Sequence, residues 1–202
     1  MRSVVFILFC IPVIVSFSCK KSIDDNSNKS LLVKGSFSYH RIIAYSATLP
    51  NKELLITNRG DSNVVAVLND NNLLLSFYTK PFSDDIIFAV PLNHLASEIV
   101  GTYKIKTKNA GEGVTNTDYI FNFYKLQNLQ HSFIIVAAAF NGNGNLAITS
   151  YDQQQNTISG TFLLNLELVP DPSVDIMEQG PIVTQNCNIK IEGTFQNVQL
   201  HN

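Results

Sequence analysis

The chain has 202 residues, a formal net charge of −2 and 45% hydrophobic residues. Its 14 basic and 16 acidic residues include no basic cluster. Nucleic-acid binding depends on clustered lysine and arginine that neutralise phosphates, so a nucleic acid is not an expected partner.

The first 18 residues predict a secretory leader. Arg2 precedes a twelve-residue apolar stretch from Val4 to Val15, which is too short for a transmembrane helix of about 20 residues. Ser16 and Ser18 are small enough for cleavage before Cys19. This segment resembles the lipobox of bacterial lipoproteins, and the Cys-Lys-Lys start is similar to lipoproteins of the Bacteroidota.

The resemblance implies that Cys19 carries fatty acyl chains such as palmitate. Those chains would anchor the protein in the outer membrane of the bacterial cell envelope, on its periplasmic or its surface face. The membrane would then be a partner through the lipid anchor. Ordinary secretion with a free Cys19 is the alternative.

The mature chain predicts a tether followed by one domain. Residues 19–30 contain one apolar side chain after the cysteine, too few to offset the entropy of ordering. Residues 31–202 have the composition of a single globular β domain. Cys187 is the one cysteine left in that domain, and alternation places it beside Ile189 and Ile191 on one strand face. A buried structural thiol is expected there.

Alternating apolar and polar residues predict strands through most of the domain. Residues 158–168 show it most clearly, because every even position except Gly160 is large and apolar. The expected strands cover residues 35–46, 53–57, 63–68, 72–79, 86–90, 101–108, 117–126, 131–140, 145–151, 158–168 and 187–200.

One short helix and several turns complete the prediction. Pro91–Glu98 is the only helical pattern, of one or two turns. Asn141–Asn145 alternates asparagine and glycine and predicts a tight hairpin loop. The fold class is therefore all-β: an antiparallel meander that forms a lipocalin-like barrel or, alternatively, a two-sheet sandwich.

A glycine precedes an aromatic residue by two positions at four places. Glycine in a strand marks a bulge or a close backbone approach, and an aromatic ring can cover the gap that it leaves. Four such places suit a strongly bent sheet. They are Gly35-Ser36-Phe37, Gly101-Thr102-Tyr103, Gly160-Thr161-Phe162 and Gly193-Thr194-Phe195.

The segments Leu146–Asp152 and Asn156–Phe162 are similar to a hairpin in a family of uncharacterised Bacteroidota lipoproteins, the DUF6252-like group. A late Gly-Thr-Phe strand, here within Glu192–Val198, recurs in that family. The resemblance implies a β-rich, lipid-anchored domain. It supplies no catalytic residues.

No local motif for catalysis, cofactor binding or metal binding is present in the sequence, so no cofactor and no metal are expected. The four histidines are scattered, without the spacing of a zinc site. Asp84 and Asp85 are adjacent on a strand and point to opposite faces, so they cannot both address one substrate. A solvated strand entrance is the expected role for this pair. Asn141–Asn145 offers oxygen atoms to calcium but no carboxylate.

The proline-rich segment 169–186 is the candidate binding loop. It joins two Gly-Thr-Phe strands, and three prolines stiffen it. Its carboxylates, Asp171, Asp175 and Glu178, are the candidate contact residues. Several tyrosines are candidates for stacking on sugars if they are exposed: Tyr39, Tyr45, Tyr78 and Tyr124.

These observations favour a lipid-anchored, non-enzymatic module that binds a ligand, an envelope protein or a glycan. The alternative is a hydrolase of envelope or dietary polymers, assembled from residues that lie far apart in the sequence. Exposed aromatics in a groove would support binding, and two carboxylates in one pocket would support the enzyme.

Overall fold

The structure is a computed structural model, which describes residues 35–45, 49–59, 64–79, 84–97, 99–124, 130–173 and 186–202. Every described residue belongs to one compact unit, Val33–Asn202. Cys19, Asp175 and Glu178 lie outside the described residues.

The described residues form eleven strands, each of which overlaps one of the predicted segments. They are β1 (Ser36–Tyr45), β2 (Lys52–Arg59), β3 (Val64–Leu68), β4 (Asn72–Tyr78), β5 (Asp84–Pro91), β6 (Gly101–Lys104), β7 (Asn116–Tyr124), β8 (Gln130–Val136), β9 (Asn141–Asp152), β10 (Thr157–Pro170) and β11 (Asn186–His201).

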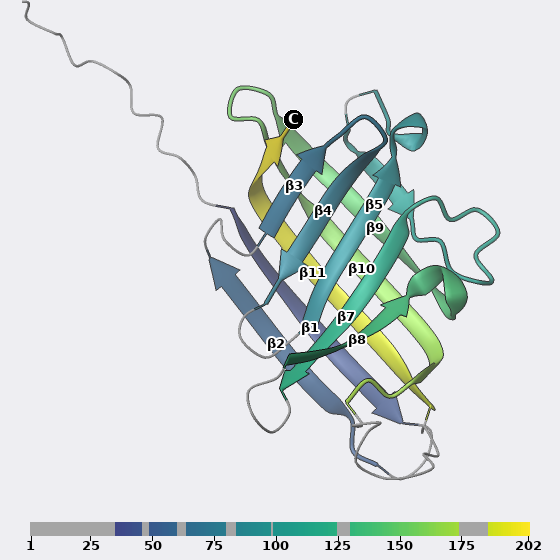
Figure 1. Ribbon diagram of the computed structural model, residues 1–202. Helices are drawn as coiled ribbons and strands as arrows, with labels where there is room; N and C mark the ends of the chain where they lie inside the picture. Colours follow the sequence, from purple (N-terminus) through teal and green to yellow (C-terminus); the bar gives the residue numbers. More distant parts are fainter. Residues whose placement is uncertain are drawn as a thin grey trace, which may run out of the picture. The chain divides into compact units, whose positions relative to one another are not determined.

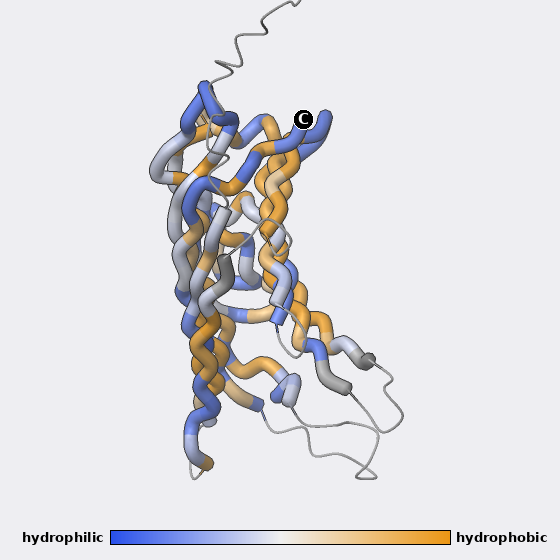
Figure 2. The backbone as a smooth tube through the Cα atoms, turned by 90° about the vertical axis from the view of Figure 1, so that its left-hand side faces the viewer, coloured by the Kyte–Doolittle hydropathy of each residue, from blue (hydrophilic) through white to orange (hydrophobic). Residues whose placement is uncertain are grey.

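The strands belong to one sheet that curls into two layers (Figure 1). Layer A has the order β2-β1-β11-β10-β9-β6, and layer B has the order β3-β4-β5-β7-β8. The layers join where the end of β11 pairs in parallel with Ala66 and Val67 of β3. A parallel bridge from Ile105 to Thr115 links them again, just after β6 and just before β7. In the edge-on view of Figure 2 the two layers lie face to face.

The all-β prediction is confirmed, and the sheet is a half-barrel. Among the described residues its path ends at β6 and β8, so it does not close as a lipocalin-like barrel does. It also differs from a two-sheet sandwich, because β11 and β3 connect the layers. The expected helix is reduced to one 3-10 turn, Leu92–His94, and a second turn, Ala137–Ala139, ends the segment predicted as strand 131–140.

Paired glycines and aromatic rings fill the space between the layers. In the register of β10 and β11, Gly160 lies opposite Phe195 and Phe162 lies opposite Gly193. A Cβ atom at Gly193 would meet the ring of Phe162, and one at Gly160 would lie 2.7 Å from Cζ of Phe195. The predicted covering of glycine by an aromatic residue is therefore confirmed here, although each ring comes from the neighbouring strand.

Rings from layer B complete this core. Phe77 of β4 lies with its centroid 4.8 Å from that of Phe162 and 5.6 Å from that of Phe195. Phe88 of β5 lies 5.3 Å from Phe162. All four rings are at most 2% exposed. The interior at this level is therefore packed with side chains.

Two bulges bend the pairing of β10 with β11. The register shifts between Ile158 and Gly160 and again between Leu166 and Val169. Asn197 and Leu168 adopt positive φ angles of 52° and 54° at these points. Each extra backbone N–H is bonded by a side chain of the opposite strand: Asn197 N–H donates to Ser159 Oγ and Leu168 N–H donates to Asn188 Oδ1, both at 3.0 Å. Such bulges increase the local twist of a sheet.

The prediction of a hairpin loop at Asn141–Asn145 is wrong, because these residues begin β9 and pair with β10. The glycines have a packing reason to be there. A Cβ at Gly144 would lie 2.9 Å from Cδ1 of Ile105, and the Ile105 N–H donates to the Gly144 carbonyl at 3.0 Å. Gly144 thus leaves room for Ile105, which follows β6. The predicted strand 101–108 ends at Lys104.

Candidate functional site

A buried ion pair joins the two layers. Arg41 of β1 donates from Nη1 to Oδ1 of Asp84 of β5 at 2.7 Å, and Asp84 is fully buried. Arg41 also donates to the hydroxyl of Tyr119 at 3.2 Å, and the hydroxyl of Tyr39 donates to Asp84 at 3.4 Å. The guanidinium lies 5.3 Å from the ring centre of Phe121. Layer A thus supplies the cation and layer B supplies the anion.

Burial raises the pKa of Asp84 to about 6, against the opposing effects of Arg41 and the two tyrosine hydroxyls. Removing a carboxylate from water disfavours its charged form, and a nearby cation favours it. Arg41 Nε is buried without a hydrogen-bond partner among the described residues. The cluster therefore carries an electrostatic cost that its hydrogen bonds offset only in part.

Asp84 and Asp85 point to opposite faces, as predicted. Asp85 Oδ2 accepts from Asn122 Nδ2 at 2.8 Å, and Asn122 Oδ1 accepts from Ser132 at 2.6 Å. The prediction of a solvated entrance is wrong for Asp84, because the strand begins inside the domain and not at its surface. None of the depressions described below is lined by Asp84 or Arg41. We interpret the pair as a clamp between layers.

Asp171, from the candidate binding loop, is 5% exposed and bonded within the domain. It accepts from the Tyr45 hydroxyl at 2.6 Å and from the Ser173 hydroxyl and N–H at 2.6 and 2.8 Å. Lys52 Nζ lies 3.7 Å away. Burial alone would raise the pKa of Asp171, but these hydrogen bonds outweigh burial and lower it. Asp171 fixes the start of the loop.

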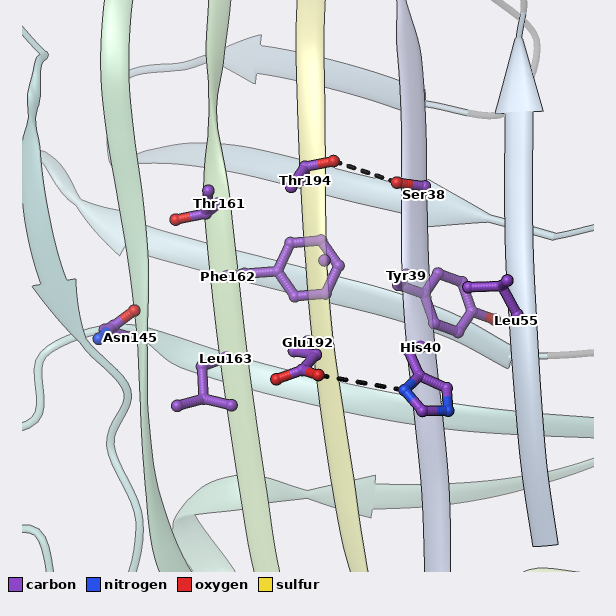
Figure 3. A pocket seen from close by; sticks show the side chains of 11 residues that line it. Ser38, Tyr39, His40, Leu55, Asn145, Thr161, Phe162, Leu163, Glu192 and Thr194 are labelled. Atoms are coloured by element: carbon purple, nitrogen blue, oxygen red, sulfur yellow. Dashed lines mark hydrogen bonds and ion pairs between the residues drawn. The ribbon is translucent and has the colours of Figure 1, made fainter.

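A polar surface covers the outer side of layer A, and we call it the polar face. Two depressions lie on it, of about 460 and 360 Å³. Figure 3 shows the first, with the strands of layer B crossing behind. The register aligns the outward residues of β1, β11, β10 and β9 in rows. The rows are Ser38–Thr194–Thr161, then His40–Glu192–Leu163–Asn145, then Ile42–Lys190–Asn165–Asn143.

Hydroxyl, amide and charged groups share the polar face with apolar side chains such as Leu55, Leu163 and Ile42. Ser38 and Thr194 share a hydrogen bond of 3.1 Å, and Asn165 donates to Asn143 at 2.7 Å. Lys190 pairs with Glu192 at 2.7 Å. Such groups donate and accept hydrogen bonds without presenting a net charge.

His40 lies between two glutamates, 3.5 Å from Glu53 and 4.0 Å from Glu192. These side chains are 33%, 60% and 49% exposed, so solvent screens their interaction. They stand on an open sheet face rather than in an enclosed pocket.

The predicted stacking tyrosines do not form a platform. Tyr39 and Phe162 border the first depression, but both are 2% exposed and belong to the core. Tyr45 bonds to Asp171, and Tyr78 of layer B is 36% exposed. The side chain of Tyr124 is outside what the structure describes.

Cys187 is 2% exposed beside Ile189 and Ile191, which confirms a buried thiol, and burial raises its pKa to about 12. In the described ranges, no three His, Cys, Asp or Glu side chains are placed to hold a metal ion. No helix in the same ranges is long and apolar enough to cross a membrane.

Comparisons of the chain with protein-family models, with curated proteins and with solved structures give no match. The resemblance to Bacteroidota lipoproteins stays a prediction that rests on the motifs quoted for it.

The Arg41–Asp84 pair and the polar face were not predicted from the sequence. Arg41 stands at an odd position of β1, in phase with Phe37, Tyr39 and Ile43, which are all buried. A charged residue in phase with a core face is a signal that a buried partner exists. The partner itself lies 43 residues away and could not be chosen from periodicity.

Proposed function

We propose that this chain is a lipid-anchored domain of the bacterial cell envelope that acts as a non-enzymatic binding module. The leader and the segment Ser16–Cys19 support the anchor, with Cys19 as the acylated residue. Acyl chains stabilise membrane attachment by about 0.8 kcal/mol for each buried CH₂ group. Membership of the DUF6252-like group, with an outer-membrane location, is part of the same proposal.

The anchor is tested by replacing Cys19 with Ala. The variant is expected to lose its fatty-acid label and to move from the membrane fraction to the soluble fraction. Retention of the label in Cys19→Ala would refute the proposal of acylation at this residue.

We assign binding to the polar face. The observation that carries this assignment is the contrast between a packed interior and open depressions on the outer side of layer A. The two depressions are lined by neighbouring rows of the same strands and so form one surface. Its hydroxyl and amide groups, set among apolar side chains, suit an envelope polypeptide or a glycan.

The candidate loop 169–186 is the competing contact surface. A basic partner bound there would be salt-sensitive, because the segment carries no lysine or arginine and, besides the internally bonded Asp171, the carboxylates Asp175 and Glu178. Shortening the loop to an Asn-Gly turn tests it. Loss of partner capture by that variant, with the strands intact, would place binding at the loop.

Matched asparagine substitutions test the polar face. Asn165→Arg adds a long charged side chain to the second depression, whereas Asn116→Arg makes the same change on the exposed outer side of layer B. Chemical crosslinking in intact envelopes is expected to lose the partner with Asn165→Arg and to keep it with Asn116→Arg. Equal capture by the two variants would contradict the assignment.

A further inference from the structure

Three strands form the edges of the described sheet: β2, β6 and β8. An edge strand presents unpaired backbone groups to other chains, and proteins protect such edges with charged residues or by keeping them short. Lys52 and Glu53 are exposed on β2. β6 has four residues, and Lys104 on it is exposed. Both edges of layer A are protected in these ways.

β8, the edge of layer B, has neither protection. Its sequence is Gln-His-Ser-Phe-Ile-Ile-Val, with no proline, lysine, arginine or carboxylate. It pairs with β7 along all seven residues without a register shift. Ile134 and Val136 are 58% and 44% exposed on its outer side. It is a regular, uncharged and apolar edge, which is the kind that pairs with another strand.

The face behind this edge is largely apolar and carries no cation, and its charged residues are Asp85 and Asp118. None of the five strands of layer B contains a lysine or an arginine. Strands with apolar residues on both sides are typical of sheets that are covered on both faces. The outward apolar residues are Val65, Val67, Leu74, Ile87, Ala89, Ile120, Ile134 and Val136.

We propose that β8 pairs antiparallel with β8 of a second copy, so that layer B continues across a two-fold axis. Two identical strands in antiparallel register are self-complementary, as a closed dimer requires. No carboxylate or lysine of β8 would oppose its own copy, and the apolar rows of both faces would continue across the junction.

The remaining charges favour edge pairing over stacking of two layer B faces. Asp118 lies on β7, opposite Val136 of β8. In an edge-to-edge dimer the two copies of Asp118 are three strand spacings apart, about 14 Å, which exceeds the Debye length of about 8 Å at physiological salt. Stacked faces would bring these carboxylates much closer together.

Sedimentation of the mature chain carrying Cys19→Ala, over a range of concentrations, tests the proposal. We expect a monomer–dimer equilibrium whose dissociation constant rises at least tenfold with Ile134→Lys. Leu55→Lys is the matched control, because Leu55 is a 73% exposed leucine on the protected edge β2. It should leave the constant unchanged. Val136→Lys replaces Ile134→Lys if circular dichroism shows that the first variant is unfolded.

Hydrogen exchange gives an independent readout without substitution. The backbone N–H groups of β8 should become more protected as concentration rises, and those of β2 should not. A monomer at all concentrations, an open-ended polymer, or a dimer weakened equally by Leu55→Lys and Ile134→Lys would each overturn the proposal. Association with an added unrelated strand peptide but not with a second copy would overturn it too.

Discussion

Layer A carries every lysine and arginine of the described strands, every strand glycine and both bulges of β10 and β11. The strands of layer B contain no lysine, arginine or glycine, and the ladders among them have no register shift. The curl of the sheet is therefore produced in layer A, where missing side chains and extra residues allow strong bending.

The contrast extends to the outer surfaces. Layer A presents hydroxyl, amide and charged groups of both signs among apolar residues such as Leu55 and Leu163, whereas layer B presents aliphatic side chains around Asp85 and Asp118 and no cation. Covering a sheet face that presents aliphatic residues lowers the free energy, because apolar surface is removed from water. Covering polar groups that are already hydrogen-bonded brings no such gain. The two layers share one interior but are suited to different neighbours.

The largest expected effect lies where the layers meet. Arg41→Met leaves the Asp84 carboxylate buried without its cation, and such losses cost about 3–5 kcal/mol of unfolding free energy at pH 7. Lys104→Met is the control, because it breaks the exposed pair of Lys104 with Glu112, and solvent screens such a surface pair. Urea denaturation measures both losses. If Arg41→Met and Lys104→Met lower the free energy of unfolding equally, the Arg41–Asp84 pair does not hold the layers together.

Acid should increase the contribution of Asp84 to the free energy of unfolding, because protonation removes a buried charge. The folded-state pKa of Asp84 is about 6, above the value of about 3.9 for an unfolded aspartate. The folded protein therefore binds more protons between these pH values, and the contribution of Asp84 to stability falls as pH rises from about 4 to about 6. Asp84→Asn cannot titrate. As pH rises from about 4 to about 6, the free energy of unfolding of Asp84→Asn should therefore rise by about 2–3 kcal/mol relative to that of the unsubstituted protein. A constant difference would contradict the raised pKa.

Gly193→Ala tests the glycine-based curvature of layer A. The new methyl group would meet the ring of Phe162 and come within 2.7 Å of the Ser38 carbonyl oxygen, and overpacking of this kind costs about 1–3 kcal/mol. At Gly111 a Cβ has nothing within 4 Å, so Gly111→Ala should have no such cost. Adding Phe162→Leu to Gly193→Ala should recover part of the loss, and strict additivity of the two substitutions would exclude the ring as its cause.

The sequence predicted the strands because alternation reports directly which residues face the core. It also predicted that glycine and aromatic residues occur together, but the pairing of Gly160 with Phe195 depends on the register between strands. The hairpin expected at Asn141–Asn145 failed for a related reason. Local turn propensity was outweighed by pairing of Asn141–Asn145 with Leu163–Glu167 of β10.

The candidate site was predictable in composition but not in position. The carboxylates of loop 169–186 were evident, yet Asp171 is bound by Tyr45, 126 residues away. The polar face contains residues from β1, β9, β10 and β11, which only the sheet topology brings together. Long-range pairing of this kind leaves no local pattern in a single sequence.

The smallest effect concerns Tyr45. Tyr45→Phe removes one of the hydrogen bonds to buried Asp171 and should cost about 1 kcal/mol. Tyr78→Phe makes the same change on layer B, where Tyr78 is 36% exposed, and should stay within about 0.5 kcal/mol. Urea denaturation measures both costs. If Tyr45→Phe lowers the free energy of unfolding less than Tyr78→Phe does, the hydrogen bond from Tyr45 does not hold Asp171 at the start of the loop.

Photo-crosslinking from one position on each layer tests the central claim most directly, namely that the two layers contact different neighbours. A photoreactive residue is placed at Thr161 on the polar face or at Ile134 on β8, in the lipidated protein within intact envelopes. The account predicts an adduct with a different envelope molecule from Thr161 and a crosslinked dimer of this chain from Ile134. A dimer from Thr161 together with a different molecule at Ile134, or the same products from both positions, would contradict it.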